Sequence, residues 1–134
     1  MSGHHKWADI KRKRTVRETK IQNAKIESTF LGVEDHGILS FFLHLDYGGI
    51  CQGFGGYSLD SYDKETEGRK STAASMELIR AILDTLEVES WEKLPGTFCR
   101  AKSDHSKVHA IGHPLKDKWL DIEEFFETRR SEGN

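Results

Sequence analysis

Long apolar runs, cysteine and proline are all scarce in this sequence of 134 residues. No apolar stretch approaches the roughly 18 residues that a membrane-spanning helix needs, so we expect no such helix and no membrane partner. Two cysteines, Cys51 and Cys99, are too few for a disulfide framework or a four-cysteine zinc site, and they fit a reducing cytoplasm. The first residues are charged rather than apolar, so we expect no secretory signal.

The length fits one domain with a single hydrophobic core. The net charge of −2 conceals an asymmetry, because residues 1–20 carry seven Lys or Arg against two acidic residues, and the remainder therefore carries −7. We predict a basic, flexible arm at residues 1–19 and one ligand-binding domain at residues 20–130. The arm either contacts nucleic-acid phosphates or is a solvated terminus, and the sequence leaves both readings open.

Apolar periodicity predicts the order of the elements. Period-two alternation is clearest within residues 38–47, and three strands at 21–33, 38–47 and 51–59 would form an antiparallel meander. Apolar residues recur at helical spacing over 72–87. Residues 60–70 are polar and predict a loop. Later strands at 97–101 and 108–111 and a short helix at 121–130 complete an α+β fold, with the meander sheet packed by one main helix.

A glycine cluster is the first candidate site. Five of the 12 glycines lie within residues 48–56, a density that indicates either tight strand bends or close approach of a ligand to the backbone. Phe54 and Tyr57 have small neighbours there, which would leave their ring faces open. The candidate ligand contacts in this cluster are Phe54, Gly55, Gly56 and Tyr57.

A basic pair before the predicted main helix is the second candidate. Arg69 and Lys70 precede the hydroxyls of Ser71 and Thr72, and a helix N-terminus adds free N–H groups and partial positive charge. Together these groups would form a phosphate site. The alternative is an ordinary capped helix with solvated basic residues.

The third candidate is a pair on a later strand. Phe98 and Arg100 are two residues apart, so they share a face of the strand, and a ring with a guanidinium can sandwich a nucleobase. The alternative places Phe98 in the core and Arg100 at its rim. The histidines and cysteines form no recognised catalytic or metal-ligand pattern, so we predict neither an enzyme nor a metal or cofactor site.

Several stretches of the chain resemble a small phage protein family, the first Thoeris anti-defence family. The most distinctive is QGFGGYSLD at residues 52–60. The resemblance spans roughly residues 20–120 and rests on residues 23–32, 34–38, 45–49, 52–60, 76–79, 91–96, 111–113 and 116–119. One departure lies at residues 71–75, where relatives often have Gly-Thr and an aromatic residue and this chain has STAAS.

The resemblance implies a function. Members of this family are sponges that hold cyclic ADP-ribose isomers, such as glyco-cyclic ADP-ribose, without cleaving them; they also bind the cyclic oligonucleotides of CBASS immunity and assemble as dimers or higher oligomers. For this chain it implies a phage-encoded, non-enzymatic binder in the cytoplasm of the infected bacterial host. The residues alone leave a second interpretation open, a nucleic-acid-binding module that uses the basic arm and the strand aromatics.

Overall fold

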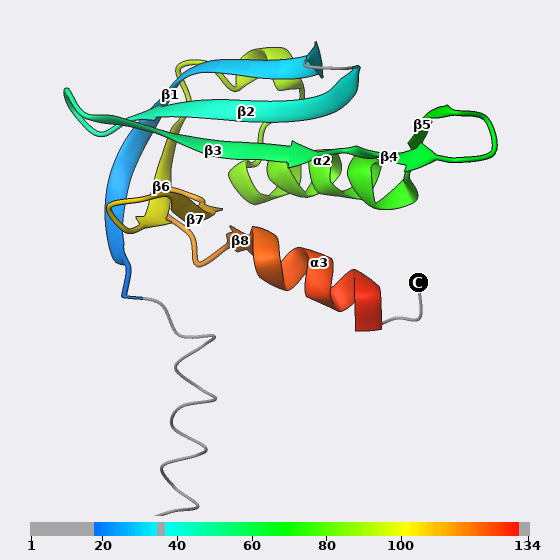
Figure 1. Ribbon diagram of the computed structural model, residues 1–134. Coiled ribbons are helices and arrows are strands. Elements are labelled where there is room, and N and C mark those ends of the chain that lie inside the picture. The colour runs from blue at the N-terminus through cyan, green and yellow to red at the C-terminus, as the bar shows by residue number, and fades with distance from the viewer. Residues whose placement is uncertain (1–17, 35–36, 132–134) are drawn as a thin grey trace, which may run out of the picture.

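The computed structural model describes residues 18–34 and 37–131, so most of the predicted basic arm lies outside the described residues. Figure 1 shows the elements in chain order. The strands are β1 (Lys20–Glu34), β2 (Ile38–Asp46), β3 (Cys51–Ser58), β4 (Asp60–Asp63), β5 (Gly68–Ser71), β6 (Phe98–Ser103), β7 (Val108–Gly112) and β8 (Trp119–Asp121). The helices are α2 (Ala73–Leu86), the 3-10 turn η1 (Trp91–Lys93) and α3 (Ile122–Ser131).

Six of these strands form one antiparallel sheet in the order β3-β2-β1-β6-β7-β8. The long strand β1 joins the two halves, because its first residues pair with β6 and the rest pair with β2. The register shifts between Ile26 and Ser28, which marks a bulge. A bulge bends a strand and increases its twist. Figure 1 accordingly shows β1 turning from the β2–β3 half of the sheet toward the β6–β8 half.

The core lies between the sheet and its helices. Phe41, Leu43 and Leu45 alternate along β2 and are completely buried, as the period of two predicts. Leu78 and Ile82, one helical turn apart on α2, are equally buried and belong to the same cluster. Burying a side chain of this size contributes about 1.5–3 kcal/mol, so this face fixes which side of the sheet the helices cover.

The predicted α+β class is confirmed. The sheet is antiparallel, one main helix packs on it, and a short helix ends the described chain. The main helix predicted over 72–87 is observed as Ala73–Leu86, and the last helix, predicted over 121–130, as Ile122–Ser131. None of the helices within residues 18–34 and 37–131 has the length and apolar character to cross a membrane.

The predicted loop over residues 60–70 is wrong. β4 and β5 pair there as an antiparallel hairpin, from Asp60 opposite Ser71 to Asp63 opposite Gly68. The sequence gives little sign of it, because the two four-residue strands are polar and none of their residues is fully buried. The hairpin is fixed instead by an ion pair between Arg69 and Asp60. The three-residue strand β8 was also not predicted, since it is too short for a periodic pattern.

Candidate functional site

The sheet face turned away from the buried cluster carries aromatic and basic side chains. On β6, Cys99 and Ala101 are buried, so the alternating residues Phe98, Arg100 and Lys102 lie on the opposite face. The pairing of β1 with β6 sets Lys25 opposite Phe98, and the pairing across β7 brings Trp119 of β8 to the same face. We call Lys25, Phe98, Arg100, Lys102 and Trp119 the basic aromatic patch.

A glycine on the neighbouring strand leaves space for the ring of Trp119. Arg100 and Trp119 both lie opposite Gly112 of the intervening strand β7. A Cβ at Gly112 would be 2.6 Å from Cε3 of the indole, so only glycine leaves room for the ring at this place on the sheet. The guanidinium carbon of Arg100 is 4.7 Å and the ammonium of Lys102 is 4.4 Å from the ring centroid. The indole therefore holds two cations close together on one face.

Arg100 is held in place by backbone acceptors. Its Nε donates to the carbonyl oxygen of His113 and its Nη2 to that of Lys116, both at 2.8 Å. A guanidinium has five N–H donors, so three remain for an external acceptor. Within the described residues, Arg100, Lys102 and Lys25 form no ion pair with a carboxylate. Lys25 does lie opposite Asp46 of β2, and its charge helps the backbone hydrogen bonds from Gly49 and Gly48 to lower the pKa of that carboxylate. Arg100 and Lys102 are therefore the cations of the patch best placed to meet an external anion.

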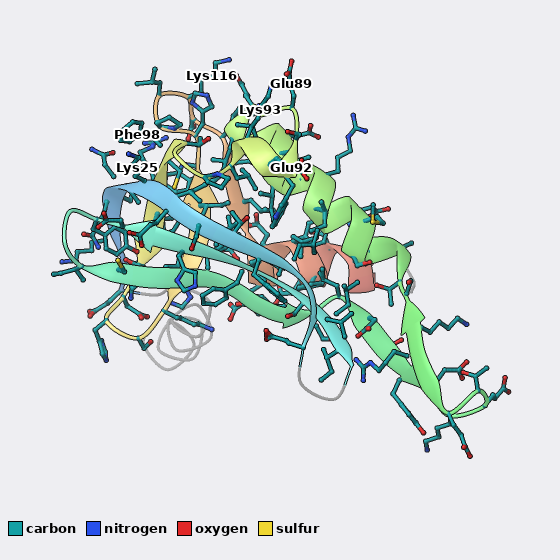
Figure 2. All side chains as sticks on the ribbon, turned by 90° about the horizontal axis from the view of Figure 1, so that it is seen from above. Lys25, Glu89, Glu92, Lys93, Phe98 and Lys116 are labelled. Carbon is teal, nitrogen blue, oxygen red and sulfur yellow. The ribbon has the colours of Figure 1, made fainter. Side chains whose placement is uncertain are left out.

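Phe98 is the open ring of the patch. Its side chain is 61% exposed although it is large and apolar, and the ammonium of Lys25 lies 5.8 Å from its centroid. Figure 2 shows Lys25 and Phe98 side by side at one margin of the molecule, with Lys116 beyond them. A flat exposed ring next to a cation suits a nucleobase with its phosphate, because every base offers a π face for stacking.

A carboxylate fixes the loop that borders the patch. Glu87, just after α2, accepts hydrogen bonds from the ammonium groups of Lys116 and Lys118 at 2.8–3.0 Å. Hydrogen bonds from Lys116 and then Lys118 lower the pKa of Glu87 to about 2. Within the same loop, His113 Nδ1 accepts from the backbone N–H groups of Leu115 and Lys116. The loop that supplies the carbonyl acceptors of Arg100 is therefore fixed by hydrogen bonds of its own.

The structure brings together the pair predicted on the later strand. Phe98 and Arg100 lie on one face of β6, as the alternation predicted, and the exposure of Phe98 excludes the alternative that places its ring in the core. The sequence did not identify Lys25, Lys102 or Trp119 as neighbours of this pair. The spacing of Arg100 and Lys102 on β6 was the available signal, whereas Lys25 and Trp119 join them only through strand pairing.

The predicted phosphate site before the main helix lies apart from this patch. Arg69 and Lys70 are on strand β5, and the Arg69 guanidinium donates to Oδ1 of Asp60 at 2.6 Å and to Oγ of Ser58 at 3.1 Å. Ser71 ends β5, and Thr72 is the N-cap residue of α2, but its hydroxyl donates to the carbonyl of Leu59 and makes no cap. Arg69, the strongest anion ligand of the four, already has an internal carboxylate partner.

The expectation of open ring faces in the glycine cluster is wrong for Phe54, whose side chain is completely buried and packs edge-on against Phe41. Tyr57 is half-buried and lies 6.2 Å from Phe126. At Gly55, which has φ of 126°, a Cβ would be 2.6 Å from the carbonyl oxygen of Phe41, and Gly56 also has a positive φ. The glycines here allow close approach of the protein's own strands, as the strand-bend interpretation predicted.

The chemistry available at the patch is recognition by stacking and charge. Among residues 18–34 and 37–131, no three His, Cys, Asp or Glu side chains are grouped as metal ligands would be. No protein-family model, curated protein or solved structure matches this chain. What the patch offers to a ligand is one exposed ring, one guanidinium fixed by backbone acceptors and two ammonium groups.

Proposed function

We propose that this protein binds phosphate-bearing cyclic nucleotides on the basic aromatic patch and sequesters them without cleavage. The observation that carries the proposal is the grouping of exposed Phe98 with Arg100, Lys102 and Lys25, none of them paired with a carboxylate in the described chain. The resemblance to the Thoeris anti-defence family supplies the ligand class, cyclic ADP-ribose isomers and cyclic oligonucleotides. It also supplies the setting, a phage protein acting in the cytoplasm of an infected bacterium.

Each side chain has a distinct part in this binding. The ring of Phe98 would stack on a purine, and the free N–H groups of Arg100 would donate to phosphate oxygens. Lys102 and Lys25 would add charge-assisted hydrogen bonds, which are about twice as strong as neutral ones. Because Arg100 is already fixed by two carbonyls, little conformational entropy is lost when it meets a phosphate.

Tight retention also requires that the ligand be covered, and a second copy of this chain would cover it. β6 pairs with β1 only up to Lys25, so residues 27–34 of β1 hydrogen-bond to a described strand on one side only. Such an edge can pair with an identical edge around a two-fold axis. The free edge begins beside Lys25, so the partner would lie next to the Phe98 end of the patch.

A second candidate function is binding of single-stranded nucleic acid, and the openness of the sheet face favours it. An uncovered sheet with rings and cations is a typical platform for an extended strand. The basic residues 1–20 would then add phosphate contacts. This alternative predicts steep salt dependence and loss of binding when residues 1–17 are deleted.

The fate of the ligand tests the proposal. Protein is mixed with a cyclic ADP-ribose isomer and filtered, and the retained fraction is heated and examined by mass spectrometry. We expect release of unchanged ligand from the parent protein and from Lys70→Ala, and reduced retention by Lys102→Ala. If Lys102→Ala retained as much ligand as the parent protein while Lys70→Ala retained less, the binding site would instead lie at the start of α2. A converted product would make the protein an enzyme, and no retention would contradict the ligand class.

A further inference from the structure

A hollow lies on the side of the sheet opposite the basic aromatic patch, beside the β2–β3 turn. Its volume is about 430 Å3, and it lies between the β2–β3 turn, the β6–β7 turn and the first residues of β1. This volume is in the range of small-molecule sites, about 300–1,000 Å3. The side chains that matter for recognition are those of Lys20, Gln22, Tyr47, Gln52 and His105.

The hollow is distinct from the basic aromatic patch. Lys20 and Gln22 alternate with Ile21 and so lie on the same face of β1 as the buried residues Ala24 and Ile26. The patch residue Lys102 lies opposite Ile21, on the other face. A ligand in the hollow would therefore meet none of the patch side chains.

A polar network fixes the walls of the hollow and leaves hydrogen-bonding capacity unused. The hydroxyl of Tyr47 donates to Oε1 of Gln52 at 2.6 Å, and Nε2 of Gln52 donates to the carbonyl of Asp104 at 2.9 Å. Nε2 of Gln22 donates to the hydroxyl of Ser103 at 3.3 Å. Each amide has two N–H donors and a carbonyl with two lone pairs, so both glutamines retain donors and acceptors for a ligand.

The hollow carries charges of both signs, because Lys20 and Asp104 line it and the carboxylates of Glu27 and Asp46 lie near Cys51 of its lining. Lys20 has no ion-pair partner in the described chain. The carboxylate of Asp104 is turned to its own loop, where it accepts from Ser106 and Lys107 and lies 2.8 Å from Nε2 of His109. Hydrogen bonds from His109 and then Ser106 lower the pKa of Asp104 well below its usual range. These hydrogen bonds hold the ionised carboxylate of Asp104 within its own loop, and Lys20 is the lysine of the lining.

We propose that this hollow is a second binding site, separate from the patch, for a purine nucleoside monophosphate. The ring of Tyr47 supplies an apolar wall for the base, and the two glutamine amides match the alternating donors and acceptors of a purine edge. Lys20 at the opening binds the phosphate, and the neighbouring imidazole of His105 adds a further hydrogen-bonding group. This site is independent of the proposed sequestration of cyclic nucleotides.

Adenosine 5′-monophosphate is the probe, and two-dimensional 15N NMR of the full chain is the readout. The backbone amides of Gly48 and Gln52 report the hollow, and the indole N–H of Trp119 reports the patch. We expect the probe to shift the Gly48 and Gln52 signals with a Kd of about 0.1–1 mM, and adenosine or inorganic phosphate alone to bind at least about tenfold more weakly. Lys20→Ala should weaken the probe about tenfold, whereas Lys102→Ala should not.

This experiment distinguishes failure of the second-site proposal from failure of the proposed function. Shifts confined to Trp119, or no shifts near Gly48 at any probe concentration, would overturn the second site and leave the proposed function standing. Binding of phosphate alone as tightly as the probe would reduce the hollow to a simple anion site and overturn the nucleoside assignment. Unchanged probe affinity in Lys20→Ala would also contradict it, since Lys20 is exposed and its variant is expected to fold.

Discussion

At the residue scale, Gly112 determines where the Trp119 ring and the two cations beside it lie. Its missing side chain lets the Trp119 indole lie close to the sheet, and the indole in turn gathers Arg100 and Lys102. Replacing a glycine that has a ring at 2.6 Å forces the ring to move, and overpacking of this kind typically costs about 1–3 kcal/mol.

We therefore predict that Gly112→Ala displaces Trp119 and weakens nucleotide binding together with stability. The indole signal in NMR spectra and a denaturant titration measure the two effects. Gly68→Ala is the matched control, because no atom lies closer than 3.9 Å to the new Cβ and the backbone there is not left-handed. A Gly112→Ala variant with an unmoved indole signal would show that the ring is not seated as described.

Glu87 gives a second prediction at this scale. Its pKa is lowered from 4.5 to about 2, so the folded protein favours the ionised form, and the stabilisation is complete above about pH 4.5 and lost as the pH falls toward 2. Glu87→Gln should therefore lower Tm at neutral pH, and its difference from the parent protein should shrink steadily below pH 4.5. Because these ion pairs are exposed, added salt should shrink it too. A difference in Tm that does not change with pH would contradict the role given to the carboxylate.

At the scale of elements, the β4–β5 hairpin depends on polar contacts rather than on apolar burial. Asp60 joins it to the sheet, because its carboxylate accepts from the Leu39 backbone N–H and from Arg69. These contacts lower the pKa of Asp60, with the hydrogen bond from Arg69 as the largest cause. The hairpin projects beyond the β2–β3 end of the sheet in Figure 1.

We predict that Arg69→Ala loosens this hairpin without unfolding the domain. Amide hydrogen exchange should accelerate at residues 60–63 and 68–71, while the six-stranded sheet stays protected and Tm falls by a few degrees at most. Nucleotide binding should be unaffected, because Arg69 lies outside the patch. Loss of binding with an intact hairpin would instead support the phosphate site predicted from the sequence before α2.

Some of the elements could be predicted from local sequence patterns and others could not. Alternation on β2 and helical spacing on α2 predicted both elements, because each buries one continuous apolar face. β4, β5 and β8 bury little and have three or four residues, so no periodicity marks them. For the site, alternate positions on β6 predicted that Phe98 and Arg100 share a face. The register that sets Lys25 opposite Phe98 joins distant segments, and no local pattern encodes it.

At the scale of the whole molecule, the free edge of β1 predicts association. Leu31 and Val33 on this edge are 41% and 64% exposed, an unusual amount for apolar residues of a central strand. Met76 on α2 is also exposed, and with Ile79 and Leu83 it lines a shallow groove on that helix. Edge pairing of two copies would extend the sheet through β1 and shelter this strand.

We predict that the protein is a dimer or larger in light-scattering measurements, and that Leu31→Lys with Val33→Lys yields monomers. Charged residues on an edge strand oppose pairing by bringing like charges together. Ile50→Lys is the control, because Ile50 is 73% exposed in the β2–β3 turn, away from the free edge. A parent protein that stays monomeric at all concentrations would contradict association, and a dimer unaffected by the double change would place the interface elsewhere.

The central claim, that the basic aromatic patch is the nucleotide site, is tested most directly by calorimetric titration of one cyclic ADP-ribose isomer into the parent protein and into Lys25→Ala/Lys102→Ala. Neither side chain forms an ion pair in the described chain, so their removal should leave the fold intact. The loss of two charge-assisted contacts predicts at least about a hundredfold weaker binding, with a weaker salt dependence. Equal affinity and equal salt dependence in the two proteins would contradict the claim.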